Sequence, residues 1–533
     1  MWWQIGCSGS SDSLPYLPVN RTTMPLPDTA VCSGRFVSHT LPYTTVIASD
    51  TVEMFDSNGA GLAVNDLDND GDLDIVLANL AGPNTILWNN GRLQFQPQSL
   101  SHGNSRAVST VDLDGDGWLE IAFTTRTGSI TVWPNENGRF TEHTTLPGVA
   151  HPAYVMSWGD LDADGDLDLV TGSYDAGLEK DFGDGFLFGD GGGVFVYENQ
   201  DGAFSPTQLA DASQALALLL VDLNEDGRLD IWVGNDFAVQ DMVWLQTEDG
   251  WETSAPFTAT THSTMSFDSA DINNDGRQEL LATDMKPYQS SSEILAQWQP
   301  VMDMMMHGEV EGDPQVMENV VQVMDEDGRF QNQAAPLGIT ATGWSWSAKF
   351  GDLDQDGYTD LYVVNGMAAA ELFSHLPENE LVEENQVFRN QGGHTFAPMP
   401  AWSLNSTDGG RSMTMADMDH DGDLDIIVNN LLAPAQIFEN QLCEGTSLLL
   451  NLTWRGTQNR NAVGTVATLV TSNGRFLREL RSNSGYLSGD PTQLHFGFPQ
   501  GTELQQLEIT WPDGEQSILS DLSAHTIVTV ERP

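Results

Sequence analysis

The sequence predicts an all-β protein, in which a seven-bladed β-propeller with calcium-binding hairpin loops is followed by a small C-terminal β-sandwich. The first observation is a nine-residue acidic pattern, D-x-[DN]-x-D-G-x-x-[DE], which begins seven times at intervals of 46 to 81 residues. An interval of this length suits one four-stranded blade, with insertions in the longer units. The second observation is that the pattern stops before residue 443, and short apolar runs separated by turn residues continue to the end.

Each acidic repeat has the composition of a calcium-binding loop. Carboxylates or a carboxamide stand at positions 1, 3, 5 and 9, and glycine at position 6 allows a sharp turn, so the oxygen atoms gather around one point. Ligand sets made only of oxygen suit hard cations, and the size and flexibility of this set favour Ca²⁺. In chain order, as loop 1 to loop 7, the predicted side-chain ligands are Asp66, Asp68, Asp70 and Asp74; Asp112, Asp114, Asp116 and Glu120; Asp160, Asp162, Asp164 and Asp168; Asp222, Asn224, Asp226 and Asp230; Asp271, Asn273, Asp275 and Glu279; Asp352, Asp354, Asp356 and Asp360; Asp417, Asp419, Asp421 and Asp425.

The residues after each loop distinguish it from an EF-hand. An EF-hand needs glutamate at position 12 and helices on both sides. Position 12 is here apolar or threonine and lies in runs such as 75–78 and 361–364, which predict β-strands. The loops therefore connect strands of β-hairpins. The alternative is a set of acidic turns that bind nothing, but packing three or four carboxylates together in each of seven loops without a cation is costly.

The charge of the chain is strongly negative. It has 77 Asp and Glu against 20 Lys and Arg in 533 residues, a formal net charge of −57. Nucleic acid is not an expected partner, because no basic patch is available to neutralise phosphates. The charge, and the weak calcium binding usual for extracellular modules, favour a protein that works in a calcium-rich medium outside the cytosol. There is no run of about 18 apolar residues, so no transmembrane segment is expected.

The first 31 residues are predicted to be a tail outside the repeats. Gly6-Cys7, followed by Ser, Gly and Asp, resembles the cleavage point of a bacterial lipoprotein whose upstream signal is cut short. Two interpretations stay open, a lipid anchor at Cys7 or a disordered tail. The predicted organisation is a tail over 1–31, a propeller over 32–443 and a sandwich over 444–533, in an extracellular, periplasmic or outer-surface protein.

The seventh repeat lacks its last strand, and this gap predicts how the ring closes. Earlier units show two strands joined by a glycine-containing turn, but the chain after loop 7 reaches Cys443 with no such return. A matching turn and strand occur at 32–39, so we expect the N-terminus to complete the last blade and remove its exposed edge. Cys32 and Cys443 then flank the same interrupted turn and predict a disulfide in an oxidising compartment. Two unpaired buried thiols are the alternative.

Three insertions, 174–193, 286–318 and 366–386, each come after the second strand of a unit, which predicts them on the face opposite the calcium loops. A serine cap and helical spacing over 291–306 predict a Met-rich helix that packs as a lid. Connections on that face carry side chains that could surround an anionic or sugar-like ligand at the propeller mouth, although each one taken alone is better explained as a structural residue. They are His102, Arg106, His151, His262, His307, Trp344, Trp346, His375 and Arg411.

The C-terminal segment predicts seven short strands, which suggests a β-sandwich. His495 stands alone in one of them and is interpreted as a core residue. No nucleophile and base have a recognisable spacing in this segment. The predicted strands are 448–454, 465–470, 476–480, 493–498, 504–511, 517–519 and 526–530.

On these motifs the chain resembles a known family. The acidic units are similar to the FG-GAP or VCBS repeats that also form the propeller of integrin α-subunits. The segments 461–464, 478–480, 485–488, 494–497 and 511–514 resemble the ASPIC/UnbV domain of the cartilage acidic protein family, with Thr465 where that family usually has alanine. The resemblance covers nearly all of 33–533 and implies an extracellular calcium-binding protein. It also implies a further ligand, the main-chain carbonyl at position 7, from Asp72, Trp118, Asp166, Arg228, Arg277, Tyr358 and Asp423.

The sequence supports three functional hypotheses. The first is a secreted or surface-attached scaffold for adhesion or ligand binding, with a glycan or protein as partner. Its calcium is mainly structural, because ordering each acidic loop is linked to binding the ion. The second is a carbohydrate-active enzyme of the polysaccharide lyase type on the insertion-bearing face. No catalytic residue can be assigned, so catalysis is the less favoured hypothesis. The third is partner recognition through the sandwich.

Overall fold

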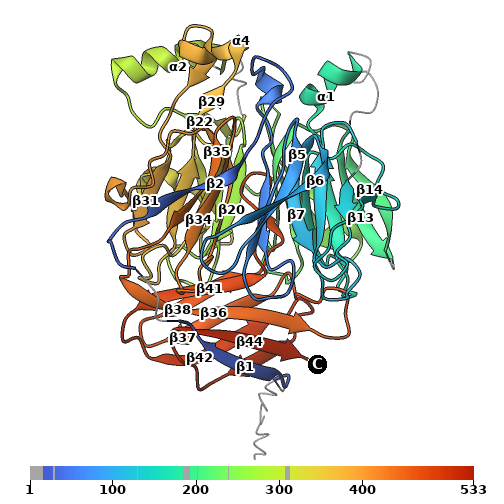
Figure 1. Ribbon diagram of the computed structural model, residues 1–533, viewed down its shortest axis with the longest axis vertical. Coiled ribbons are helices and arrows are strands. Elements are labelled where there is room, and N and C mark those ends of the chain that lie inside the picture. The colour runs from blue at the N-terminus through green and yellow to red at the C-terminus, as the bar shows by residue number, and fades with distance from the viewer. Residues whose placement is uncertain are drawn as a thin grey trace, which may run out of the picture.

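The computed structural model describes residues 16–27, 31–128, 130–183, 192–200, 202–237, 239–305 and 313–533. Cys7 and His307, and the side chain of His102, lie outside this description, so their suggested roles stay predictions. Figure 1 shows a ring of sheets with the C-terminal strands packed below it and helices above it. None of the described helices is both long and apolar enough to cross a membrane.

The described residues form seven sheets in which the strand before an acidic loop pairs antiparallel with the strand after it. The first sheet also includes a short hairpin at 483–489, whose second strand pairs parallel with the first strand of that sheet. Strands such as Ala215–Val221 are apolar and fully buried, as expected when neighbouring sheets cover both faces. From first to last strand, the sheets consist of β3 (Leu62–Asn65), β4 (Asp74–Leu77), β5 (Pro83–Trp88) and β6 (Gln96–Gly103); β7 (Ser105–Val111), β8 (Glu120–Thr125), β9 (Thr131–Trp133) and β10 (Thr144–Thr145); β11 (Val155–Gly159), β12 (Asp168–Gly172), β13 (Val194–Gln200) and β14 (Ala203–Ala210); β15 (Ala215–Val221), β16 (Asp230–Asn235), β17 (Met242–Thr247) and β18 (Gly250–Ser254); β20 (Ser266–Ala270), β21 (Glu279–Thr283), β24 (Val320–Met324) and β25 (Phe330–Asn332); β27 (Ser347–Gly351), β28 (Asp360–Val364), β31 (Gln386–Asn390) and β32 (Phe396–Pro398); β33 (Gly410–Ala416), β34 (Asp425–Asn430), β35 (Pro434–Glu439) and β2 (Val37–Thr44).

The ring closes through the N-terminal strand, as predicted. The first strand of each sheet contacts the first strand of the next, and β33 contacts β3. β2 pairs antiparallel with β35, with Val37 opposite Glu439. The predicted disulfide is confirmed, because Cys32 and Cys443 are bonded with their Cα atoms 5.6 Å apart. The covalent link therefore lies beside the strand pair that joins the two ends of the ring.

The three insertions lie on the face away from the C-terminal strands, as predicted (Figure 1). They contain α1 (Asp175–Phe182), α2 (Ser292–Met305) and α4 (Ala370–Phe373). The predicted cap of α2 is present, because the Ser291 hydroxyl accepts a hydrogen bond from the Ile294 N–H at 3.3 Å. Trp298 of this helix is buried and packs on Trp344, with ring centroids 5.7 Å apart. The remaining short elements of the ring are β19 (Thr260–Thr261), β22 (Met285–Lys286), β23 (Gln315–Val316), β26 (Gly343–Trp344), β29 (Met367–Ala368) and β30 (Glu380–Leu381), with the helical turns α3 (Ala334–Leu337), η1 (Met54–Asp56), η2 (Pro377–Asn379) and η3 (Pro400–Trp402).

The C-terminal segment forms two four-stranded sheets around their own apolar core. One sheet contains a strand from the N-terminal 31 residues, which the sequence pattern had assigned to a tail. This N-terminal strand pairs antiparallel with the last strand of the chain. It covers the edge that the last strand would otherwise expose. The first sheet runs β1 (Asn20–Pro25), β44 (Thr526–Arg532), β36 (Gly445–Trp454) and β41 (Gln493–Pro499), and the second β38 (Arg475–Glu479), β37 (Val466–Thr471), β42 (Leu504–Thr510) and β43 (Gln516–Leu519).

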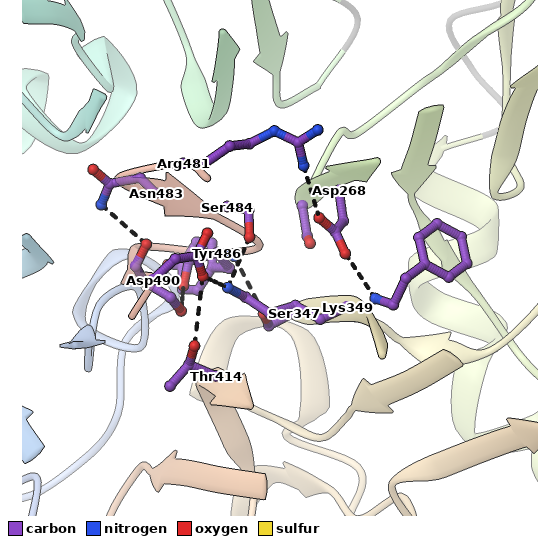
Figure 2. A network of polar contacts seen from close by, with 12 residues as sticks. Asp268, Ser347, Lys349, Thr414, Arg481, Asn483, Ser484, Tyr486 and Asp490 are labelled. Carbon is purple, nitrogen blue, oxygen red and sulfur yellow. Dashed lines mark hydrogen bonds and ion pairs between the residues drawn. The ribbon is translucent and has the colours of Figure 1, made fainter. Parts of the chain in front are cut away.

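A hairpin from the sandwich enters the central channel of the propeller. It consists of β39 (Asn483–Ser484) and β40 (Ser488–Gly489), and it contacts the first strands of the propeller sheets around it. Its tip residue Tyr486 is fully buried and accepts a hydrogen bond from the Gly59 N–H at 3.0 Å. Figure 2 shows its polar contacts, in which Lys349 donates to the Ser484 hydroxyl at 2.7 Å and forms an ion pair with Asp490. The hairpin thus fixes the sandwich to the ring.

Candidate metal centres

The backbone of every acidic loop turns twice through the left-handed region. The glycines at position 6 have φ between 85° and 98°, and the residues at position 4 have φ between 56° and 73°. Glycine reaches this region without steric cost, and asparagine more readily than most residues. The sequence identified the turn at position 6, but not the turn at position 4, because that position holds varied residues such as Asn69, Ala163 and His420.

Main-chain hydrogen bonds orient the first and last carboxylates in the same way in all seven loops. The position 6 N–H donates to the position 1 carboxylate, at 2.8 Å from Gly227 to Asp222 and at 3.2 Å from Gly165 to Asp160. The position 2 N–H donates to the carboxylate at position 9. Each loop therefore holds its two end ligands toward its own centre before any ion binds.

In five loops three carboxylates converge, with oxygen atoms within 4.8 Å of one another. Loops 4 and 5 carry a carboxamide at position 3, Asn224 and Asn273, and so have one carboxylate fewer. The converging groups are Asp66, Asp68 and Asp70; Asp112, Asp114 and Glu120; Asp160, Asp162 and Asp168; Asp352, Asp354 and Asp356; and Asp417, Asp419 and Asp425.

The electrostatics of these groups suit a bound cation. Asp68, Asp160 and Asp417 each have a buried carboxylate oxygen without a hydrogen-bond partner in the structure. Burial, with neighbouring carboxylates adding to it, raises the pKa of Asp74 and of Glu120 to about 8. A buried carboxylate is costly unless it is paired, protonated or bound to a metal. The loops can therefore hold an oxygen-preferring cation, and a divalent ion would offset this cost.

The side chains at position 7 do not point at the loop centres in a common way. The Asp72 carboxylate lies 2.7 Å from Nε2 of His420 in loop 7, and Nε of Arg228 donates to the Gln246 carbonyl at 3.1 Å. This is compatible with a main-chain role for position 7, and the carbonyl ligands there stay a prediction.

Asparagines at the end of four of the third strands join an acidic loop to its neighbour. The Asn89 N–H donates to the Asp74 carboxylate at 2.9 Å, while its side-chain amide donates to the Met418 carbonyl of loop 7 at 2.8 Å. The amides of Asn135, Asn390 and Asn440 likewise reach the position 2 carbonyl of the preceding loop. In these four blades, neighbouring acidic loops are therefore joined by a direct hydrogen bond.

The sandwich contacts several loops directly. The Asn459 N–H donates to the Gly165 carbonyl of loop 3 at 2.8 Å, and the Arg460 guanidinium reaches the Gly115 carbonyl of loop 2 at 3.3 Å. His495 is buried, as predicted, and Nε2 lies 3.1 Å from the Gly422 carbonyl of loop 7. Its burial lowers the pKa to about 3, so the ring is neutral and can donate this bond.

The arginines predicted at the mouth are buried beneath it. The Arg411 guanidinium lies 4.5 Å from the Trp346 ring centroid and donates to the carbonyls of Ser57 and Gly366. Arg106 is also buried, and burial lowers its pKa. Two of the described histidines make other contacts: His151 stacks on Phe195, and a His375 ring nitrogen lies 3.0 Å from the Gln297 carbonyl. A cavity of about 160 Å³ lies elsewhere, between the ring and the sandwich, lined by residues that include Asp268, Lys349, Arg478, Arg481 and Asp490.

Two family models match the chain. The model described as FG-GAP-like repeat matches residues 66–123, 112–171, 222–282, 311–363 and 370–428. The chain belongs to the FG-GAP-like repeat family. The model described as ASPIC and UnbV matches residues 455–533, so this member of the family carries that domain at its C-terminus. The resemblance found in the sequence is thereby confirmed.

A curated relative and solved structures are also similar to this FG-GAP repeat protein. Cartilage acidic protein 1 of Mus musculus is 24% identical over 538 residues, which cover 89% of this chain and 74% of the relative. The structure of BBS1N in complex with ARL6DN has a TM-score of 0.44 at 10% identity, covering 76% of this chain and 96% of that one. The Neurospora crassa Pan2 WD40 domain has a TM-score of 0.42 at 9% identity, covering 77% and 97%.

Proposed function

We propose that the seven acidic loops bind Ca²⁺ and that the ion is mainly structural. The observation that carries this proposal is the convergence of carboxylates in loops whose end ligands are already oriented by main-chain N–H groups. Buried carboxylate oxygens without partners, such as that of Asp417, support it further. Each ion would neutralise a cluster of like charges at the turn between two strands, and would thereby hold adjacent blades in register.

The function proposed for the whole molecule is a secreted or surface-attached scaffold for adhesion or ligand binding. The Cys32–Cys443 disulfide is compatible with an extracellular or periplasmic location. Loops 2, 3, 6 and 7 contact the sandwich. The insertions with α1, α2 and α4 lie on the opposite face of the ring, which is the face we assign to a glycan or protein ligand (Figure 1). Calcium then maintains the shape of the ring that presents this surface.

Calcium removal is the direct test. Stripping the ions with a chelator is expected to lower the thermal midpoint, because each site held at a hundredfold excess over its Kd contributes about 2.7 kcal/mol. Calorimetric titration of the stripped protein should show several sites, and Asp417→Asn should remove one of them. Asp249→Asn, in an exposed turn outside the loops, is the matched control. Equal midpoints with and without chelator, together with no heat of binding, would refute the calcium proposal.

The scaffold role needs a separate measurement. A glycan array and a set of extracellular-matrix proteins, probed with the calcium-loaded protein, are expected to show saturable binding that the chelator abolishes. Variants in exposed insertion residues, such as Glu371→Ala, should weaken it, whereas Glu515→Ala in the sandwich should not. Cleavage of uronate polymers without retained binding would favour the enzymatic hypothesis instead.

A further inference from the structure

One side-chain position lies beside the metal loop in several blades and differs in charge between them. It immediately precedes the asparagine whose N–H donates to the position 9 carboxylate. That bond measures 2.8 Å in each of three blades, from Asn199 to Asp168, from Asn390 to Asp360 and from Asn440 to Asp425. The preceding residues Glu198, Arg389 and Glu439 are therefore structurally equivalent.

Two of the three equivalent residues add negative charge to their loop. The position equivalent to Arg389 holds a glutamate in both loop 3 and loop 7, Glu198 and Glu439. An additional carboxylate near the loop increases the attraction for a divalent cation. Loops 3 and 7 are thus biased toward binding.

Arg389 does the opposite in loop 6. Its Nε lies 2.5 Å from the carboxylate of Asp354 at position 3, and Nη2 lies 3.1 Å from that of Asp356 at position 5. The Asp354 side chain is fully buried, with 0% exposed, so this is not an ion pair between freely moving surface groups. One guanidinium therefore engages two of the four predicted side-chain ligands of the same loop.

The other arginines near loops do not have this geometry. Arg228 forms an ion pair with Asp226 alone, and Arg277 pairs with Glu225, which is not a predicted ligand. Both are at position 7 of their own loop and are more exposed than Arg389. Arg389 comes from β31, a strand of the rigid blade, and reaches across to the loop. Only in loop 6, among the described residues, do the ion pairs join an arginine to carboxylates at both position 3 and position 5.

We infer that Arg389 is a built-in counter-ion of loop 6 that competes with Ca²⁺ for Asp354 and Asp356. This inference rests on the calcium binding proposed above. A calcium ion entering loop 6 must displace the guanidinium or share its ligands with a positive charge a few ångströms away, and both lower its affinity. Loop 6 therefore fills last among the five loops with three converging carboxylates, and keeps its shape when calcium is scarce.

Loop 6 lies against the sandwich, so its counter-ion also affects how that domain is attached to the ring. A Cβ atom at Gly357 of the loop would lie 2.7 Å from the Phe476 ring of the sandwich, so the loop forms part of the seat for that domain. The Arg389 guanidinium keeps this part of the contact surface ordered without calcium. The sandwich then stays attached at loop 6 while the other loops respond to the ion.

The test is site-by-site calcium occupancy. Crystals of the full chain, equilibrated in a series of calcium concentrations, are measured by anomalous diffraction, and the concentration that half fills each loop is compared. We expect loop 6 to need at least about tenfold more calcium than loop 3, a difference of roughly 1.4 kcal/mol. Arg389→Gln should remove this gap, and Glu198→Arg should transfer it to loop 3. Arg475→Gln, which removes an exposed ion pair with Glu508, is the control.

The outcomes separate this inference from the proposed function. Loops 3 and 6 filling together in the unmodified protein would overturn the role of Arg389 while leaving calcium binding intact. That measurement needs no variant and is unaffected if a substitution fails to fold. Calcium absent from every loop at saturation would refute the proposed function itself. A lag in loop 6 that persists in Arg389→Gln would also overturn the inference, because the cause would then lie elsewhere in the loop.

Discussion

The acidic loops share one nine-residue pattern but differ in their surroundings. The position 6 turns of loops 2, 3, 6 and 7 are covered by the sandwich, whereas those of loops 1, 4 and 5 are open, with no neighbour there. The glycine at this position shows the difference. A Cβ atom added at Gly422 would lie 2.8 Å from Ser447, and one at Gly165 would lie 3.1 Å from Thr457, both in the sandwich. A Cβ atom at Gly71, Gly227 or Gly276 would meet nothing within 4 Å. The repeat therefore specifies ligand geometry, and distant chain segments specify the surroundings.

The four covered loops therefore have a second role, which is to contact the sandwich. In the open loops glycine is needed for its backbone conformation alone. In the covered loops it also leaves room for the sandwich, which bonds to main-chain carbonyls such as those of Gly165 and Gly422. Since these carbonyls belong to the acidic loops, the calcium binding proposed above would stabilise the same conformation as docking of the sandwich. The two would then be thermodynamically linked.

The largest expected effect comes from the hairpin that holds the cover in place. Tyr486→Ala removes a fully buried ring that packs on Trp346 and bonds to Gly59 and Tyr154. We expect a loss of about 3 to 5 kcal/mol in the free energy of unfolding, measured with denaturant, because a large cavity is left in the channel. In hydrogen exchange, amides of the covered loops should lose more protection than those of the open loops.

Tyr486→Phe is the matched control for that prediction. It keeps the ring and loses only the hydroxyl contacts, so about 1 to 2 kcal/mol is expected. Equal loss of protection in covered and open loops would show that the hairpin supports the ring as a whole and has no special relation to the cover.

A pair of glycine substitutions gives the next effect in size. Gly227→Ala in loop 4 introduces only backbone strain, at φ 85°, and should cost about 1 to 2 kcal/mol. Gly422→Ala in loop 7 has a similar φ of 91°, but the new methyl group also meets Leu26 and Ser447 at 2.8 Å. Overpacking adds about 1 to 3 kcal/mol, so we expect Gly422→Ala to lower the denaturation midpoint further. Equal costs would mean that the sandwich yields without resistance at loop 7.

The features that could be predicted from the sequence are those set by local patterns. The acidic loops, the strands beside them, the completion of the last blade by residues near Cys32 and the disulfide to Cys443 all derive from spacing within or between repeats. The seven C-terminal strands derive from turn residues and apolar runs. For the loops and strands the sequence signal lies in the element itself, and for the ring closure and the disulfide it lies in an interrupted repeat whose two parts are 411 residues apart at the cysteines.

The features that sequence reasoning missed depend on contacts between distant segments. The entry of Tyr486 into the channel, the pairing of β1 with β44 and the approach of Arg389 to Asp354 leave no periodic signal in the chain. Arg106 and Arg411 were expected at an open mouth because a connection's residues can face either solvent or channel. Both are buried, with Tyr486 of the hairpin, which comes from another part of the sequence, close to them.

The smallest expected effect is a pH dependence that should separate a covered loop from an open one when calcium is absent. Burial, above all, raises the pKa of Asp352 in loop 6 to about 8, whereas Asp222 in loop 4 shows a smaller rise, also from burial. The folded chain then binds a proton that the unfolded chain, with an ordinary aspartate, has released. Stability from this group is full below the unfolded pKa of 3.8 and is lost as pH rises through about 8.

In calcium-free buffer, the free energy of unfolding should therefore fall from about pH 7 to about pH 8, by up to about 1.4 kcal/mol for each such group. Asp352→Asn should flatten this slope more than Asp222→Asn, because an amide at position 1 has no proton to lose. Urea denaturation at the two pH values measures both slopes, and saturating calcium should abolish the dependence by holding the carboxylates ionised. A stability that rises over this interval would show that Asp352 is already ionised in the empty loop, and that the sandwich does not bury it as the covered geometry requires.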